Sequence, residues 1–391
     1  MSKDQTLQRR FILYKGLKDL LVIYPVYTLL FNEAGISLPQ ISILLALWSL
    51  PVVLLELPSG ILADRWSRRG MILFSTLLKS LCFLLWAIDQ SFLFFALGFL
   101  CWGCSEAFSS GSEEALLFDS LKQSGREKQF EIIYAKASSA SGVAVAVSCF
   151  AGGYLVGVLG FKVVLMLSSL TSFAAFLLAF SFKEVNLFKE QQEPQKIAIL
   201  HEACSYILKK RGVLAMAALL IVPIALAGIL DEYDPLIATS YNLPITFVGF
   251  WVGGRYLLEG LGAVLAPRFG QRSVLLCLLS GLFLLVNSLL AMQYTLLFYF
   301  LFYLLLSSAA VIQENKIQMS IEEQGRSTVH SLISLAMNLH AILVFALLHL
   351  VDDLRIVRLA IALYCLASTL IIVLLGHSHK KGSADAEPSD A

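Results

Sequence analysis

The sequence predicts an all-α polytopic membrane protein, with twelve transmembrane helices in two pseudo-symmetric six-helix bundles. Of its 391 residues, 58% are hydrophobic and only 15% are charged, and the mean hydropathy is +0.77. A soluble protein carries about 25% charged residues. Because the charge deficit extends along the whole chain, it indicates a protein that crosses the bilayer many times.

Twelve apolar segments are each long enough to span a bilayer as a helix, which takes about 20 residues. None shows the alternating polar and apolar pattern of membrane β-strands, so the expected spans are helices. Residues 1–10 are polar and basic, and the first apolar segment is too long for the core of a removable signal peptide. The expected spans are 11–33, 40–62, 71–88, 91–118, 132–158, 162–182, 212–232, 245–266, 273–290, 293–318, 327–350 and 354–376.

Basic residues are distributed unevenly between the two sides of these spans. With the N-terminus in the cytoplasm, about twenty Lys and Arg fall in cytoplasmic segments, and only Lys162, Arg355 and Arg358 fall in outer ones. Short loops of membrane proteins follow this positive-inside distribution. We therefore expect a multi-pass protein of the cytoplasmic (inner) membrane with both termini in the cytoplasm.

The longest polar stretch follows the sixth span and divides the chain into two halves. From Pro194 onward its apolar residues repeat at helical spacing, which predicts a short helix on the membrane surface. A plain linker is the alternative. The expected organisation is an N-terminal six-helix bundle over 1–182, a cytoplasmic linker with an interfacial helix over 183–211, a C-terminal six-helix bundle over 212–376 and a cytoplasmic tail over 377–391.

The turn between the second and third spans has the pattern Gly-x-x-x-Asp-Arg-x-Ser-Arg-Arg over residues 60–69. A related segment returns in the second half, where Ala266 aligns with Ala63 at an offset of 203 residues. The same offset places Glu56 on Glu259. Transporters are commonly built from parallel repeats of this kind, with the substrate held between the halves.

This turn resembles the cytoplasmic loop between the second and third helices of major facilitator superfamily transporters. In that family the acidic residue and the basic cluster act as a latch, which opens when the protein changes the side that it faces. Charge that only sets the topology is the alternative interpretation. Pro267 replaces the Asp in the second half, so the N-terminal turn is the expected working latch. The resemblance implies a conformational latch made of Gly60, Asp64, Arg65, Arg68 and Arg69.

Two further segments, residues 110–121 and 326–329, resemble bacterial members of the same family. Two signatures of its drug:proton antiporters are missing, because Phe99 stands in the place of an Arg and Ser148-Cys149 in the place of a Gly-Pro. These differences argue against a typical drug antiporter and leave the fold unaffected. The resemblance and the repeat together imply an inner gate made of Glu56, Glu259, Asp119 and Arg326.

Ionisable residues inside the spans are the candidates for transport chemistry. Such a side chain at mid-bilayer costs about 2.5–3.5 kcal/mol on insertion scales, so it should face a partner or a water-filled cavity. Glu106 lies near the middle of the fourth span, and Ser110 and Glu113 share its helical face. This polar stripe is expected to line the cavity, with Glu106 handling a proton or the substrate. A structural pair with a buried Lys is the alternative.

Arg255 lies near the middle of the eighth span, where it is expected to attract an anionic group of the substrate. Glu259 lies one turn away, and a pair that neutralises itself within the helix is the alternative. Asp231 and Asp234 fall near outer helix ends, so we expect both to be solvated.

Asp19 and Glu314 complete the residues expected to handle the proton or the substrate. Asp19 has Lys15 one turn earlier on the same helix as an alternative partner. Glu314 lies deep in the tenth span but nearer the cytoplasm, and a role in the gate is its alternative.

The resemblance and these charges imply a secondary active transporter that moves a small organic solute by alternating access. Many aromatic residues at cavity-like positions favour an amphiphilic solute, and buried carboxyl groups favour proton coupling. Export is expected, uptake of a nutrient or siderophore is the alternative, and a non-transporting receptor or assembly subunit is a remote one. The expected partners are a small-molecule substrate, H⁺ and the lipid bilayer. No enzymatic activity, cofactor, metal, nucleic-acid partner or nucleotide-binding loop is expected, and the protein should be a monomer.

Overall fold

The computed structural model describes residues 3–65, 67–185, 211–290, 292–320 and 326–384. These residues are almost entirely helical, and no strand occurs among them. Their contacts group them into two compact units. Unit 1 comprises Met1–Glu193 and Pro235–Gly253, and unit 2 comprises Pro194–Asp234 and Gly254–Ala391.

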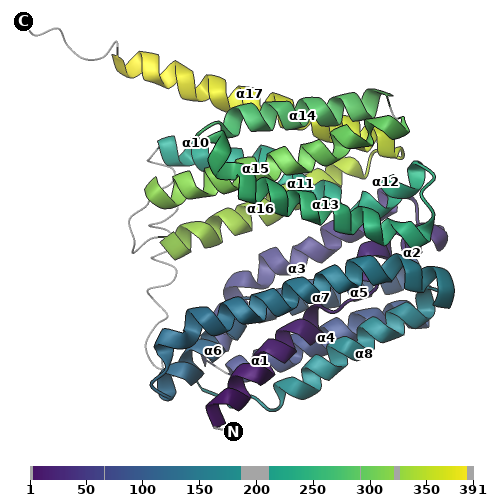
Figure 1. The fold of residues 1–391 in the computed structure, drawn as a ribbon, viewed down its shortest axis with the longest axis vertical. Helices are drawn as coiled ribbons and strands as arrows, with labels where there is room; N and C mark the ends of the chain where they lie inside the picture. The colour runs from purple at the N-terminus through teal and green to yellow at the C-terminus, as the bar shows by residue number, and fades with distance from the viewer. Residues whose placement is uncertain (1–2, 66, 186–210, 291, 321–325, 385–391) are drawn as a thin grey trace, which may run out of the picture. The chain divides into compact units, whose positions relative to one another are not determined.

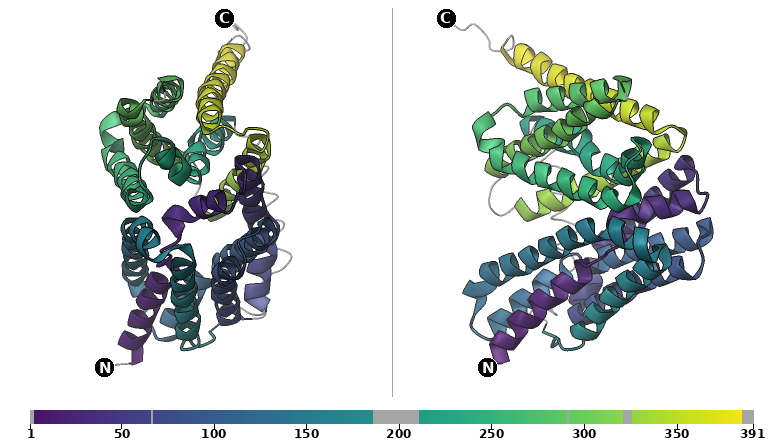
Figure 2. Two further views of the ribbon diagram at one scale, coloured as in Figure 1. Left: turned by 90° about the vertical axis from the view of Figure 1, so that its right-hand side faces the viewer. Right: turned by 45° about the vertical axis from the view of Figure 1, so that its right-hand side comes forward.

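Each unit is a bundle of long helices, which the left view in Figure 2 shows nearly end-on. In unit 1, α4 packs against α5 and α8, and α1 packs against α7 and α8. The elements up to the connecting segment are α1 (Lys3–Asp19), η1 (Tyr24–Val26), α2 (Tyr27–Glu33), α3 (Leu38–Arg65), α4 (Arg68–Ile88), α5 (Phe92–Ser109), α6 (Ser112–Gln123), η2 (Glu127–Gln129), α7 (Phe130–Leu159) and α8 (Phe161–Ala179) (Figure 1).

In unit 2, α14 packs between α15 and α17, and α11 packs against α16 and α17. Residues 186–210 of the connecting segment lie outside the described residues, so the predicted linker helix and the domain boundaries stay predictions. The later elements are α10 (Arg211–Leu219), η3 (Leu220–Ile224), α11 (Leu226–Asp231), α12 (Asp234–Ser240), α13 (Ile245–Leu265), η4 (Ala266–Phe269), α14 (Ser273–Leu290), η5 (Gln293–Thr295), α15 (Leu296–Ser320), α16 (Arg326–Leu348) and α17 (Leu354–Ala384).

Nine helical segments of the described chain are long and apolar enough to cross a membrane. The other three expected spans are helical but fall short of that measure. The first is interrupted, the apolar part of the eleventh is only Leu332–Leu348, and Arg255 and Glu259 lower the hydropathy of the eighth. The bounds of most helices agree with the predicted spans to within a few residues.

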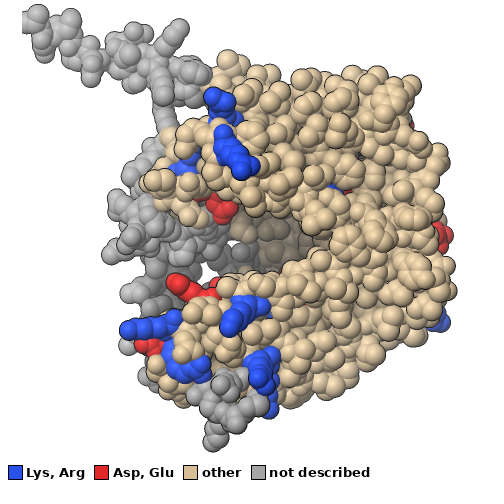
Figure 3. Space-filling model, viewed as in Figure 1, with Lys and Arg blue, Asp and Glu red and all other residues tan. Residues whose placement is uncertain are grey.

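Charged side chains lie mainly near the helix ends in the view of Figure 3. In unit 1 they gather beside α6 and the start of α1, and the broad visible surface of α7 and α8 is uncharged. Residues such as Val143, Val147 and Leu170 on these helices are large, apolar and exposed. A bilayer provides the apolar surroundings that such a surface requires.

The first expected span is not continuous, which corrects the prediction of one helix over 11–33. Pro25 has no amide hydrogen and its ring clashes with the carbonyl one turn earlier, which favours a break at this position, although α3 continues through Pro51 and Pro58. Two side chains of α8 bond the backbone groups that the break releases. Ser168 Oγ accepts from the amide of Ile23 at 3.1 Å, and Thr171 Oγ1 donates to the carbonyl of Leu20 at 2.8 Å.

The seventh span is also distorted at a proline. A π-helical turn over Leu220–Ile224 contains Pro223 and joins α10 to α11. π-Turns inside helices are often found at functional sites. The first span is therefore interrupted, and the seventh, which corresponds to it in the predicted repeat, is distorted but continuous.

The fourth expected span divides into two helices, α5 and α6. Gly111 between them has a φ of +69°, a left-handed conformation that glycine adopts without steric cost. The change of direction at Ser110 and Gly111 interrupts the helical face that Glu106 and Glu113 were expected to share. The continuous polar stripe predicted from the sequence is therefore wrong, although both carboxylates are still held inside unit 1.

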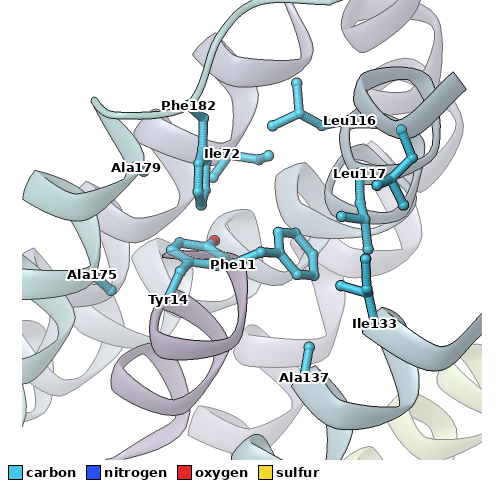
Figure 4. Close-up of a cluster of buried hydrophobic side chains, with 11 residues drawn as sticks. Phe11, Tyr14, Ile72, Leu116, Leu117, Ile133, Ala137, Ala175, Ala179 and Phe182 are labelled. Carbon is cyan, nitrogen blue, oxygen red and sulfur yellow. The ribbon is translucent and has the colours of Figure 1, made fainter. Parts of the chain in front are cut away.

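A cluster of buried apolar side chains holds α1 against the rest of unit 1 (Figure 4). The Tyr14 and Phe182 rings pack edge to face, at a centroid distance of 5.3 Å. Burial of such side chains contributes roughly 1.5–3 kcal/mol each. The cluster consists of Phe11, Tyr14, Ile72, Leu116, Leu117, Leu121, Ile133, Ala137, Ala175, Ala179 and Phe182.

We predict that Gly262→Ala destabilises the protein, whereas Gly260→Ala on the same helix does not. A Cβ at Gly262 would lie 2.2 Å from the carbonyl oxygen of Leu304 on α15, and a Cβ at Gly260 would meet nothing within 4 Å. Ala favours a helix interior over Gly by about 1 kcal/mol, so the control should be neutral or more stable. Melting of the purified proteins in detergent measures both effects, and equal melting temperatures would contradict this packing.

Candidate functional site

The predicted latch and the predicted gate meet at a buried ion pair. Arg68, the first residue of α4, pairs through Nη1 with Oδ2 of Asp119 on α6, and both side chains are buried. The same Nη1 donates to the carbonyl of Ala115 at 3.3 Å. The pair therefore joins the turn before α4 to α6 within unit 1. The sequence analysis proposed both residues but not that they are partners.

Glu184 binds the start of α4 from the opposite end of the unit 1 sequence. Its carboxylate accepts from the amides of Arg68 and Arg69 at 3.1 and 3.0 Å, and from the hydroxyl of Ser67. Unpaired amides at a helix N-terminus attract negative charge, which explains this position. Arg69 also donates to the carbonyl of Phe180 at 2.8 Å. Sequence reasoning missed Glu184, because more than a hundred residues separate it from the helix that it caps.

Several predicted latch and gate residues cannot be placed. The structure does not describe the side chains of five of them. They are three residues of the turn and two of the expected gate. The residues concerned are Glu56, Gly60, Asp64, Arg65 and Arg326.

Glu113, at the start of α6, is the centre of a buried polar group in unit 1. Its carboxylate accepts from Tyr14 Oη at 2.9 Å, Lys15 Nζ at 2.9 Å and Lys18 Nζ at 2.6 Å, all from α1. Three donors from one helix therefore converge on one carboxylate, and Lys18 was not singled out from the sequence. Asp19 on the same helix does not pair with Lys15; it accepts a hydrogen bond from Ser141 on α7.

Glu106 on α5 has the lysine partner that the sequence analysis gave as its alternative. Lys79 Nζ of α4 lies 2.8 Å from Glu106 Oε1, and Trp102 Nε1 donates to the same oxygen at 3.1 Å. The Lys79 side chain is buried, whereas 36% of the Glu106 side chain is exposed. Trp102 packs among further rings, stacking on Phe99 at a centroid distance of 6.1 Å. Glu106 thus presents a partly open carboxylate beside an aromatic surface.

Arg255 on α13 is the most heavily paired residue of unit 2. Its guanidinium uses Nη1 for Glu259 at 2.7 Å, Nη2 for Asp231 and Nε for Asp234. The predicted pair with Glu259 therefore exists, but it is one of three. The expectation that Asp231 and Asp234 are solvated is wrong, because only 17% and 0% of their side chains are exposed.

Tyrosines surround this cluster. The guanidinium carbon of Arg255 lies 3.9 Å from the ring centre of Tyr256 and 4.7 Å from that of Tyr303. The Tyr256 hydroxyl donates to Asp231 at 3.0 Å, and Tyr299 on α15 donates to Asp234. A cation over a ring face gains about 0.5–2 kcal/mol. The rings therefore add to the acids in holding the arginine in place.

The remaining predicted residues of unit 2 take different positions. Glu259 lies with Arg255, and Ser307 on α15 donates to its backbone carbonyl at 2.7 Å. Glu314, further along α15, is exposed. The neighbouring Lys316 donates to the carbonyl of Gln271 at 2.9 Å.

A family model supplies the observation that decides the protein family. The model of the Major Facilitator Superfamily matches residues 19–345. The chain belongs to this superfamily. Its fold is accordingly the twelve-helix transporter fold of that superfamily, in agreement with the sequence prediction. A search of curated proteins finds no match.

Solved structures agree with this fold over nearly the whole chain. The crystal structure of the nucleoside transporter NupG has a TM-score of 0.71 at 13% identity, and the alignment covers 96% of this chain and 99% of that one. PepTSo of the POT family has a TM-score of 0.73 at 12% identity, covering 96% and 98%. A bacterial homologue of the human lysosomal transporter Spinster, inward-facing and occupied, has 0.73 at 12%, covering 96% and 97%. At these identities the likeness shows the fold alone.

We predict a non-additive response when the buried Arg68–Asp119 pair is broken. Removing one member of a buried pair costs about 3–5 kcal/mol, largely because the other charge is left without a partner. Asp119→Asn should therefore lower the melting temperature strongly, and Arg68→Met added to it should recover part of the loss. Glu114→Gln, an exposed position on the same helix, is the matched control. Additive losses in this double-mutant cycle would contradict the pairing.

Proposed function

We propose that the chain is a proton-coupled secondary transporter that exports a small amphiphilic organic solute across the cytoplasmic membrane by alternating access. The observation that carries the proposal is that each unit holds buried ionisable side chains within its spans. Ionisable residues in spans are costly, and they mark substrate and proton pathways. In this chain they form networks that link several helices.

The interrupted first span and the distorted seventh span support the same proposal. Helices broken at corresponding positions in the two halves are the usual builders of transporter binding sites. Here the break near Pro25 and the π-turn at Pro223 occupy the first and the seventh span. Both are adjacent to polar networks, since Asp19 precedes the break and Asp231 ends the helix that follows the π-turn.

Glu106 is the side chain that we propose to contact the solute. It is the most exposed carboxylate in the described ion pairs, and its neighbours Trp102 and Phe99 provide an apolar surface. Such a combination fits a solute with both a polar group and an apolar body. No enzymatic activity is part of the proposal.

The latch and the topology complete the proposal. We place both termini and the turn over 60–69 in the cytoplasm, on the distribution of Lys and Arg along the sequence. Asp64, Arg65, Arg68 and Arg69 would then close the cytoplasmic side in the outward-facing state. The bonds of Arg68 to Asp119 and of Arg69 to Phe180 support this, because they fasten the turn to α6 and to the end of α8.

Asp64→Asn should impair transport without abolishing membrane insertion. The test measures uptake of a panel of compounds by liposomes that contain the purified protein, under an imposed pH gradient. A separate measurement of dye efflux from intact cells distinguishes export from uptake. Arg268→Gln, in the second-half turn that lacks the Asp, is the control and should transport at nearly the wild-type rate. Full transport by a well-folded Asp64→Asn protein would remove the latch role.

Glu106→Gln should raise the KM for the transported compound while leaving its dependence on the pH gradient in place. The substitution removes the negative charge but keeps the size of the side chain. A raised KM would therefore report the loss of a contact between the carboxylate and the solute. Counterflow, which needs no gradient, measures the KM. An unchanged KM in a folded protein would show that Glu106 does not contact the solute.

A further inference from the structure

We propose that Asp231, Asp234 and Glu259, gathered around Arg255, form the proton-binding site of this transporter. The proposal rests on the function proposed above, since it names the group through which transport is coupled to protons. It also changes the expected role of Arg255, from attracting an anionic substrate to holding three carboxylates together.

The cluster contains more negative than positive groups. One guanidinium faces three carboxylates, so with all groups ionised the network carries two negative charges in excess. A buried charge without a counter-charge is costly, and a carboxylate in that position takes up a proton instead. Transfer of one H⁺ from a hydronium ion breaks an O–H bond of that ion, forms one on a carboxylate and lowers the excess charge to one.

The buried network of unit 1 has no such excess. It contains three cations and three carboxylates, so an added proton would unbalance it. Glu106 has Lys79 at 2.8 Å, and Glu113 has Lys15 and Lys18 at 2.9 and 2.6 Å. The members of this network are Lys15, Lys18, Lys79, Asp19, Glu106 and Glu113.

The geometry of unit 2 assigns different parts to the three acids. Asp234 is fully enclosed between Arg255 and the Tyr299 hydroxyl, with the Tyr303 hydroxyl 3.4 Å from the same carboxylate oxygen. Asp231 and Glu259 are 17% and 24% exposed, so a proton can reach the cluster through either of them. Asp234 is then the enclosed carboxyl that holds the proton.

Arg255 is the cation that the described ion pairs place against these acids. The largest electrostatic influences of charged groups on Asp234 are those of Arg255, Asp231 and Glu259. On α16, which packs against α11, His340 bonds to the Tyr364 hydroxyl at 3.0 Å. The buried cation of α17 is Arg358, whose charge is not among the largest influences on Arg255.

A proton fits this cluster better than a metal ion does. The guanidinium of Arg255 occupies the centre of the cluster, where it already pairs with one carboxylate oxygen of each acid. In the described parts of the chain, no group of three His, Cys, Asp or Glu side chains is arranged to hold a metal. The competing ligand, Na⁺, is an outcome that the experiment below distinguishes.

The test is infrared difference spectroscopy of the purified full-length protein during acid and base titration. This measurement needs no substrate, so it succeeds or fails independently of the transport proposal. A protonated carboxyl group gives a carbonyl stretch that the ionised form lacks. We expect one component of this band in the wild type that is absent from Asp234→Asn and retained in Glu106→Gln. Loss in Glu106→Gln, or retention in Asp234→Asn, would overturn the proposal.

A second variant keeps the test decisive if Asp234→Asn does not fold. Tyr299→Phe removes only the hydroxyl that donates to Asp234, and this hydrogen bond favours the charged carboxylate. The band should therefore appear at a higher pH in Tyr299→Phe than in the wild type. An unchanged or a lower titration pH would contradict the assignment to Asp234.

Transport in liposomes then connects the site to coupling. Asp234→Asn should retain counterflow but lose accumulation driven by a pH gradient, down to the level of protein-free liposomes. Accumulation that the variant retains, or that a Na⁺ gradient drives in the wild type, would overturn the proposal. A wild-type protein that shows the titrating band but no transport would refute the proposed function and leave the proton site standing.

Discussion

A charged side chain within an apolar span must find its partner inside the protein, and this constraint organises both units. The three cases are Lys79 with Glu106, Glu113 with its donors from α1, and Arg255 with its acids. In each case the partners come from different helices, so the pairing fixes how those helices lie against one another. The apolar cluster around Phe11 and Tyr14 then packs helices whose positions the polar contacts also specify.

The helix interruptions follow from the same constraint on backbone groups. A proline or a left-handed glycine releases amides and carbonyls that lipid cannot satisfy. At the first break Ser168 and Thr171 of α8 take over those bonds, and at the fourth span Gly111 redirects the chain so that α6 can present Glu113 to α1. The first break therefore lies where polar side chains from a neighbouring helix are available.

The number and the bounds of the helices were predictable, because a long apolar run has one stable form in a bilayer. The two clear failures were continuity through Pro25 and through Gly111. Composition measures how apolar a segment is and says little about where it bends. Both residues are visible in the sequence, but a proline alone does not mark a break, because α3 continues through Pro51 and Pro58.

Partners were less predictable than candidates. Helical spacing identifies residues on one face, so the contact between Arg255 and Glu259 could be stated as an alternative. It cannot identify contacts between helices, and so Glu184, Lys18 and the buried state of Asp234 were missed. The dipeptide Asp234-Pro235, at the start of α12, was the one local hint that this acid begins a helix and is held in the protein.

Because Arg255 contacts three acids, evolutionary change at these four positions should be coupled. A lysine has a single compact ammonium group and lacks the planar fork that lets one side chain reach Asp231, Asp234 and Glu259 at once. Replacing the arginine alone would strand acids on three separate helices, and losing one acid would alter the balance that the others share. Related sequences should therefore keep all four residues or exchange them together. In an alignment of relatives, the four positions should covary.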